Sequence, residues 1–337
     1  MNITTLILGF IFGSILQYAR LNRYNTISGM ATLENYTVAK AIAVAVGVGA
    51  IIVALETGFG LASYNIKPLL LGGIAIGGII FGVGMAILGY CPGTLPVSLG
   101  EGSIDALIGI IGGMAGGLVY TIFVPAIQSI LGPDLGSFSL FTLIGNNNGL
   151  FYLSVFIVGG IFILAAFWLN KLEKKNNYRW FYAGIALALL NPILMLSFVA
   201  NRPLGASGLY PYLADLMTGT TDNPYFAKIK GPGNWELWLL TGAFISGLVI
   251  SLLRKEFKLT LIHSNWEKYK GKSVPKRIIW SFIGGFILIF GARMAGGCTS
   301  GHVISGGMQL ALSSLLFGAF VFAGLLITGR YFYKGNN

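Results

Sequence analysis

Charged residues are scarce in this chain of 337 residues. Asp, Glu, Lys and Arg together make up 10% of the sequence, whereas hydrophobic residues make up 55%. Soluble domains carry about 25% charged residues, so this composition is too poor in charge to cover a water-exposed surface. The scarcity argues against a soluble protein and predicts an all-α polytopic membrane protein.

Acidic residues, histidine and cysteine are scarcer still. The chain has 11 Asp and Glu, two histidines and two cysteines. Two cysteines cannot build a disulfide framework, and His302 with two distant cysteines provides too few ligands for zinc. We therefore expect no metal and no cofactor. The 22 Lys and Arg give a net charge of +11, but they are concentrated in a few short loops. That pattern indicates membrane topology and not nucleic-acid binding.

Long apolar runs are abundant, as is glycine with 49 residues. Small residues let helices approach closely within lipid. Runs long enough to cross roughly 30 Å of hydrocarbon predict about nine transmembrane helices. The predicted spans are residues 3–19, 37–58, 68–89, 104–131, 148–169, 180–200, 235–253, 276–294 and 309–328. Four further stretches are too apolar for exposed loops and too broken for spans, and we expect short re-entrant helices in them: 20–31, 91–102, 201–217 and 298–308.

The basic segments predict an orientation. Residues 171–179 and 254–277 hold clusters of Lys and Arg, and such clusters face the cytoplasm in most membrane proteins. Two predicted spans separate them, so they share a side. If the four broken stretches do not cross the membrane, the C-terminus lies in the cytoplasm and the N-terminus outside.

The two halves of the chain resemble each other weakly. Glycines with matching spacing precede both Cys91 and Cys298. We predict a first inverted repeat over residues 1–131, a connecting span with loops over 132–178, and a second inverted repeat over 179–337 with the cytoplasmic loop 254–277. Inverted repeats with interrupted helices indicate a substrate site near the bilayer midplane. Broken backbone at that depth must be buried or line a cavity.

Cys91 and Cys298 are the strongest candidates for this site, because they occupy the same position in the two repeats. A thiol is a weak, polarisable hydrogen-bond donor that suits a soft sulfur anion. The alternative is that each cysteine is a small buried hydrophobic residue.

Three polar residues adjoin Cys298. Arg293 lies within a predicted span, where an ionised side chain costs about 2.5–3.5 kcal/mol, so it is a candidate for anion binding or for a structural ion pair. Thr299 and His302 follow the cysteine directly. Thr299 is a candidate for substrate binding or for helix capping, and His302 for binding an anion or moving a proton.

An Asn-Arg pair occurs in a broken stretch of each half. Asn22 and Arg23 form the first pair, and Asn201 and Arg202 form the second. We expect the two asparagines either to line the substrate path or to cap helices, and the two arginines either to act in that path or to extend to the membrane interface.

Glu101 and Asp105 follow the first cysteine. Their spacing predicts that both lie on one face of a helix, where we expect them to serve in capping or in ion pairs, with a proton relay as the alternative.

The string Cys298-Thr-Ser-Gly-His302 after two glycines, together with Gly89-Tyr-Cys91-Pro, resembles the YeeE/YedE family of bacterial inner-membrane proteins. The resemblance covers most of the chain. It implies an hourglass-like fold, uptake of thiosulfate or a related small sulfur anion along a central path of cysteines, and no enzymatic activity. It also implies a sulfur-carrier partner of the TusA type at the cytoplasmic face. The family's early Arg-x-Cys reads Arg20-Leu21-Asn22 here, so the path has two cysteines in place of three.

Two other hypotheses stay open at this point. The protein could be a channel or carrier for another small substrate, with cysteines that only pack. It could also be a membrane thiol-redox protein, although the chain has no Cys-x-x-Cys motif. In every case the surroundings are membrane lipid, and no nucleic acid is expected.

Overall fold

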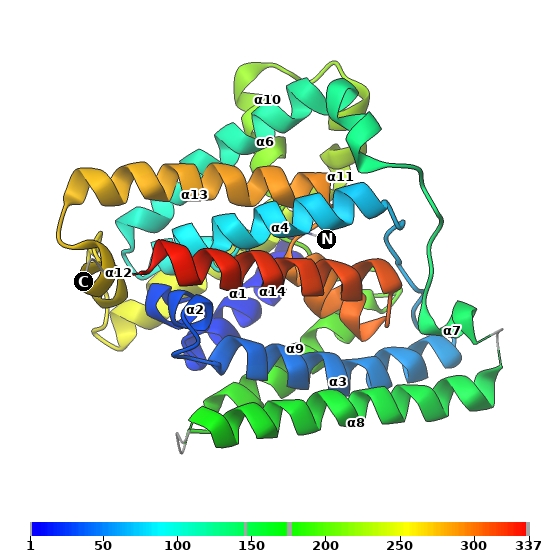
Figure 1. Ribbon diagram of the computed structural model, residues 1–337. Helices are drawn as coiled ribbons and strands as arrows, with labels where there is room; N and C mark the ends of the chain where they lie inside the picture. The colour runs from blue at the N-terminus through cyan, green and yellow to red at the C-terminus, as the bar shows by residue number, and fades with distance from the viewer. Residues whose placement is uncertain (1, 145–146, 174–176, 335–337) are drawn as a thin grey trace.

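The computed structural model describes residues 2–144, 147–173 and 177–334. These residues form helices, with isolated bridges in place of any β-strand, as Figure 1 shows. Seven of the helices are long and apolar enough to cross a membrane. They are α3 (Thr37–Gly58), α4 (Leu71–Leu88), α6 (Ile104–Leu131), α8 (Asn148–Glu173), α11 (Pro224–Leu253), α13 (Val274–Met294) and α14 (Leu312–Phe332). The all-helical membrane class is thus confirmed.

Two shorter apolar helices occupy the places of the other predicted spans. They are α1 (Asn2–Tyr18) and α9 (Arg179–Met195). At a rise of about 1.5 Å per residue, the 17 residues of each helix extend about 25 Å. The total of nine spans therefore remains a prediction.

Each of the four broken stretches contains one short helix. These are α2 (Tyr24–Ala31), α5 (Leu95–Gly100), α10 (Leu209–Thr218) and the π-helix η1 (Thr299–Gly306). Glycine permits the turn before each cysteine: Gly89 has φ 79° at the end of α4, and Gly296 has φ 74° after α13. Other residues adopt such left-handed angles at a cost. Two further short helices, α7 (Leu140–Leu143) and α12 (Ser264–Lys270), lie in connecting segments.

One predicted boundary is wrong. The span expected over 235–253 begins at Pro224 in the structure. The side chain of Asn223 accepts a hydrogen bond of 2.7 Å from the amide of Phe226, and proline is favoured in the first turn of a helix. This cap starts the helix earlier than its hydrophobicity indicates.

The prediction that Glu101 and Asp105 share a helix face is also wrong. Helix α5 ends at Gly100 and α6 begins at Ile104. Gly102, with φ 97°, turns the chain between them. The two carboxylates therefore belong to different elements.

The long helices pack in crossed pairs. Helix α4 lies against α13 in the middle of the molecule, and these two also contact α14 and α6 respectively. In a second set, α1 packs on α11 and α9 packs on α3, while α8 covers the other side of α3. Figure 1 shows α13, α4 and α14 side by side, with α3 and α8 farther from α13. Glycines allow these contacts: a Cβ added at Gly112 of α6 would lie 2.1 Å from the carbonyl oxygen of Phe282.

The basic segments lie at one end of the molecule. Helix α12 contacts α2, and Lys268 of α12 pairs with Glu34 at 2.6 Å. Lys40 at the start of α3 pairs with Glu173 at the end of α8. Figure 1 places the C-terminus at this end and α7 at the other. We call the first the basic end and the second the opposite end.

Candidate functional site

The two cysteines lie together inside the protein. Cys91 occupies the turn between α4 and α5, and Cys298 directly precedes η1. Both are free thiols. Their side chains interact electrostatically, and the Cys91 thiol also lies beside the hydroxyl of Thr299. Cys298 is 1% exposed and Cys91 is half-buried. Thiols from distant parts of the sequence thus share one polar region, which we call the thiol site.

Three hydroxyl groups surround the thiol site. The Thr94 hydroxyl donates to the carbonyl of Cys91 at 3.0 Å and accepts from its amide at 2.9 Å, which fixes the turn. The Tyr210 hydroxyl donates to the carbonyl of Pro92 at 2.6 Å and interacts with both thiols. The Thr299 hydroxyl is buried and has no hydrogen-bond partner in the described part of the chain. An unsatisfied buried polar group costs about 1–3 kcal/mol, so this hydroxyl favours a ligand.

All four broken stretches approach this region. A Cβ added at Gly93 would lie 3.0 Å from the hydroxyl oxygen of Ser300 and 3.5 Å from the Cβ of Ala206. The turn after Cys91 therefore touches both broken stretches of the second half. On the side toward α2, the Ser98 hydroxyl of α5 donates to the carbonyl of Asn22 at 2.6 Å. The buried Asn22 Oδ1 is without a partner among the residues described.

A cluster of basic side chains lies next to Cys298. Lys67, in the loop between α3 and α4, interacts electrostatically with Cys298, Arg293, Arg202 and Glu236. Its ammonium donates to the carbonyl of Gly296 at 2.9 Å. We call Lys67, Arg202 and Arg293 the cation cluster. With the carboxylate of Glu236 included, these four groups leave two positive charges when all are ionised.

The arginines of the cation cluster are held by aromatic and hydroxyl groups. Arg293 donates from Nε to the Tyr225 hydroxyl at 2.6 Å and from Nη1 to the Ser207 hydroxyl at 3.2 Å. The guanidinium of Arg202 lies 4.6 Å from the centre of the Trp235 ring, which favours the cation. Its Nε finds no partner among described atoms.

Glu236 interacts both with the two arginines of the cation cluster and with the backbone. Its carboxylate accepts a hydrogen bond of 2.9 Å from the amide of Leu209, at the start of α10. This carboxylate compensates one of the three positive charges of the cation cluster, so two positive charges remain for an anion.

Sequence analysis did not identify Lys67. A signal was present, because Lys67 is the one basic residue between Lys40 and Lys171. The structure shows why it matters: burial lowers the pKa of Lys67 to about 8, against a weaker opposite effect of Cys298. The lysine is a cation at neutral pH and becomes neutral a little above it.

Two predicted residues lie away from the thiol site. Arg23, at the basic end, pairs with Glu256 at 2.6 Å and with Glu101 at 3.8 Å. Asn201 is exposed, with φ 50° in the turn after α9. The structure therefore brings Arg202, but not Asn201, toward the thiols.

His302 is occupied by structural hydrogen bonds. Its Nδ1 lies 2.9 Å from the Ser314 hydroxyl and its Nε2 lies 2.8 Å from the carbonyl of Ala295. These bonds tie η1 to α14 and to the end of α13. Across the described ranges, no group of three or more His, Cys, Asp or Glu residues could hold a metal ion.

A buried ionic network lies directly beside Cys91, on the side of the basic end. Asp105 accepts hydrogen bonds from Arg277 at 2.5 Å and from the Tyr90 hydroxyl at 3.2 Å. His263 lies 3.1 Å from the same carboxylate. Tyr90 is the neighbour of Cys91 in sequence, so this network fixes the backbone that presents the thiol. The ion-pair role predicted for Asp105 is present, with Arg277 as the partner.

Comparison with known proteins agrees with this architecture. Residues 19–327 match the family described as sulphur transport. The chain therefore belongs to this family of sulphur-transport membrane proteins, which confirms the resemblance to YeeE/YedE.

Two relatives are similar over nearly their whole length, and each carries the name thiosulfate transporter TsuA. The relative from Spirochaeta thermophila is 26% identical over 337 residues, which cover 95% of this chain and 96% of that protein. The relative from Escherichia coli K12 is 23% identical over 329 residues, covering 90% and 86% respectively. Both names describe transporters, in agreement with the expectation that the chain is not an enzyme.

Proposed function

We propose that the protein takes up thiosulfate, or a closely related small sulfur anion, across the bacterial inner membrane through a path that passes Cys298 and Cys91. The observation that carries the proposal is the thiol site itself. Two free cysteines from distant parts of the chain lie together inside the protein, beside the unpartnered hydroxyl of Thr299. The names of the two relatives support the same substrate.

The cation cluster is the proposed receiving site for the anion. Thiosulfate is a dianion at neutral pH, and the two uncompensated positive charges beside Cys298 match it. Arg293 and Arg202 can each contact an anion with planar N–H donors. Lys67 adds a point charge at the mouth of the path.

From the cation cluster the anion passes to the thiols. Cys298, Thr299 and Cys91 offer S–H and O–H donors to its sulfur and oxygen atoms. Thiols are weak donors, and conduction requires each site to release what it binds. Beyond Cys91 the path continues along α5 toward Asn22, whose buried side-chain amide lies 3.5 Å from the Ser98 hydroxyl.

The remaining predicted residues are proposed to position the path and not to contact substrate. His302 holds η1 through both ring nitrogens. Arg23 closes an ion-pair network at the basic end. Asn201 forms the exposed turn that directs Arg202 inward.

We further propose that the fold contains two inverted repeats, residues 1–131 and 179–337, joined by residues 132–178. In these repeats α1, α3, α4 and α6 correspond to α9, α11, α13 and α14. The packing supports this correspondence, because α4 contacts α14 and its counterpart α13 contacts α6. Likewise, α1 contacts α11 and its counterpart α9 contacts α3. With α1 and α9 counted as spans, the seven long helices become nine. Placing the basic end in the cytoplasm puts the C-terminus inside and the N-terminus outside. It also offers a positively charged face to a sulfur-carrier protein of the TusA type.

The test uses Cys91→Ala and Cys298→Ala in a bacterial host that cannot take up sulfate. We expect both variants to reach the membrane in normal amounts, to grow normally on cysteine and to fail on thiosulfate. A matched control is Ser129→Ala, which removes an exposed hydroxyl on α6. Undiminished growth on thiosulfate in both cysteine variants would refute the proposed path. Failure on thiosulfate with little protein in the membrane would indicate that the cysteines only pack.

A further inference from the structure

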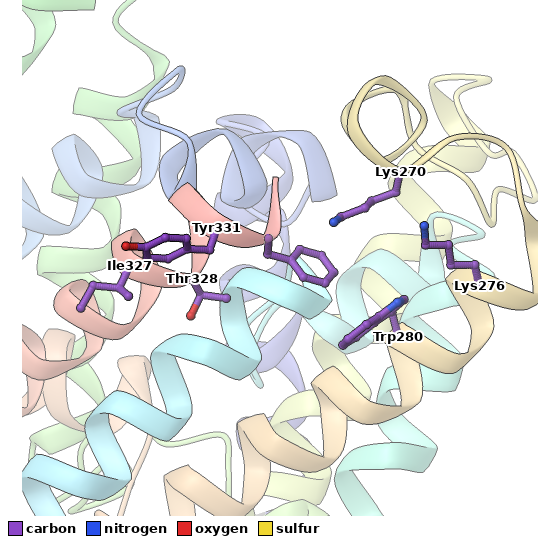
Figure 2. Close-up of a pocket in the computed structure, with 7 residues that line it drawn as sticks. Lys270, Lys276, Trp280, Ile327, Thr328 and Tyr331 are labelled. Carbon is purple, nitrogen blue, oxygen red and sulfur yellow. The ribbon is translucent and has the colours of Figure 1, made fainter. Parts of the chain in front are cut away.

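A pocket at the basic end lies apart from the thiol site. It has a volume of about 540 Å³ and lies where α12, α13 and α14 meet, as Figure 2 shows. Its lining residues combine bases, aromatic rings and aliphatic groups: Lys270, Lys276, Trp280, Ile327, Thr328, Tyr331 and Phe332.

Two ammonium groups share this pocket without a carboxylate. The side chains of Lys270 and Lys276 lie on the same side of it in Figure 2. Lys270 Nζ lies 4.2 Å from the centre of the Phe332 ring. Partial burial and, after it, the charge of Lys276 lower the pKa of Lys270. An anion held between the two lysines would relieve their repulsion.

The neighbouring lysines, Lys268 and Lys272, each have a carboxylate partner. Lys268 pairs with Glu34 at 2.6 Å, and Lys272 pairs with Glu267 at 3.1 Å. Throughout the part of the chain that is described, no ion pair involves either pocket lysine. The segment thus alternates compensated and uncompensated lysines, and both uncompensated ones face one pocket.

The other wall of the pocket is suited to lipid. Ile327 is 60% exposed and Tyr331 is 71% exposed, both in the last turns of the membrane helix α14. Trp280 of α13 packs edge-on against Phe332, with 4.9 Å between the two ring centroids. Tryptophan and tyrosine concentrate at the level of lipid headgroups. The pocket therefore presents positive charge next to an aliphatic surface at the end of two spans.

We propose that this pocket binds the phosphate headgroup of an anionic phospholipid. Lys270 and Lys276 contact the phosphate, Thr328 is within the same pocket as a hydroxyl donor, and an acyl chain runs along Ile327 on α14. Basic pockets between membrane helices on the cytoplasmic side are suited to such headgroups. Free phosphate would leave the aliphatic wall unused, and an acidic protein would not require so much exposed apolar surface beside the lysines.

The test measures lipid retention and does not depend on transport. The full-length protein is purified in detergent, mixed with phosphatidylglycerol or phosphatidylcholine, and examined by native mass spectrometry. The pocket variant is Lys270→Gln with Lys276→Gln. The matched control is Lys268→Gln with Lys272→Gln, which changes the net charge equally in the same segment.

We expect the pocket variant to lose its preference for phosphatidylglycerol by roughly thirtyfold, because both of its lysines lack a carboxylate partner and are free to attract the anionic headgroup. The control should keep that preference. Equal losses in both variants would assign the effect to net charge and overturn the proposal, as would no loss in either. Competition by inorganic phosphate at the same concentration as the lipid would indicate a free-anion site, which also overturns it. The single variant Lys276→Gln, at an exposed position, provides a second measurement if the double variant folds poorly.

Discussion

Replacing Lys67 by glutamine should weaken thiosulfate uptake without unfolding the protein. Lys67 lies in the loop between α3 and α4, and its ammonium rests on the carbonyl of Gly296, next to Cys298. Glutamine keeps a similar length and a hydrogen-bond donor for that carbonyl. The substitution therefore removes the charge and little else.

The size of the effect follows from the charge that is lost. Two unit charges about 4 Å apart attract by about 1 kcal/mol in water and about 4 kcal/mol at an effective dielectric of 20. Lys67 is half-buried, and exposed charges are screened, so the lower part of this range applies. A loss of about 1–2 kcal/mol corresponds to a roughly fivefold to thirtyfold higher KM for thiosulfate.

The pH dependence gives an independent check. The pKa of Lys67 is lowered to about 8, so the group is a cation below pH 8 and neutral above it. The wild-type KM for a dianion should therefore rise as the pH increases through about 8. A bound anion favours the charged lysine, so the pKa of Lys67 is higher in the filled site, and KM stops rising once the pH passes that higher value.

The assay is uptake of radiolabelled thiosulfate into proteoliposomes between about pH 6.5 and pH 9.5, a range centred on the pKa of the lysine. Lys67→Gln should show a high KM that does not change over this range. Lys67→Arg, whose guanidinium stays charged, should show a low KM that is also constant. The control is Lys228→Gln, which removes a charge from an exposed position on α11. A wild-type KM in Lys67→Gln, or a wild-type KM that does not vary with pH, would refute the role given to this lysine.

Two further predictions concern stability. Asp105→Asn leaves the buried guanidinium of Arg277 without its carboxylate and should destabilise the protein by about 3–5 kcal/mol; an unchanged melting temperature in detergent would contradict this. Gly112→Ala puts a methyl group 2.1 Å from the carbonyl oxygen of Phe282 and should cost about 1–3 kcal/mol by forcing α6 from α13. Gly160→Ala on α8 meets no atom within 4 Å, so its melting temperature should stay at the wild-type value or rise slightly.

Much of the fold follows from local properties of the sequence. A membrane span can be predicted from the length of one hydrophobic run, such as residues 104–131, without reference to the rest of the chain. The structure places α6 over the same residues. Breaks in such runs are equally local, and each predicted broken stretch contains a short helix. The start of α11 was missed because it depends on a hydrogen bond from the amide of Phe226 to the Asn223 side chain, which hydrophobicity does not report.

The candidate site is less accessible from sequence, since its members come from distant segments. The two cysteines were predicted as site residues because they occupy the same position in the two repeats. The structure brings them together. Arg202 and Asn201 are neighbours in sequence, yet the guanidinium of Arg202 is half-buried against Trp235 and interacts with Lys67, whereas Asn201 is exposed. His302 follows the cysteine in the motif, but its two ring nitrogens contact the Ser314 hydroxyl of α14 and the carbonyl of Ala295 at the end of α13.

An all-helical membrane protein with paired cysteines in interrupted helices could be predicted from the amino-acid sequence, because hydrophobic length, glycine breaks and motif spacing are encoded locally. The charges that accompany those cysteines became known from the three-dimensional arrangement. Lys67 is far from Arg202 and Arg293 in the chain and joins them because the loop after α3 folds against the backbone before Cys298. Which side chains become neighbours depends on long-range packing, and a pattern of residues along the chain does not contain that information.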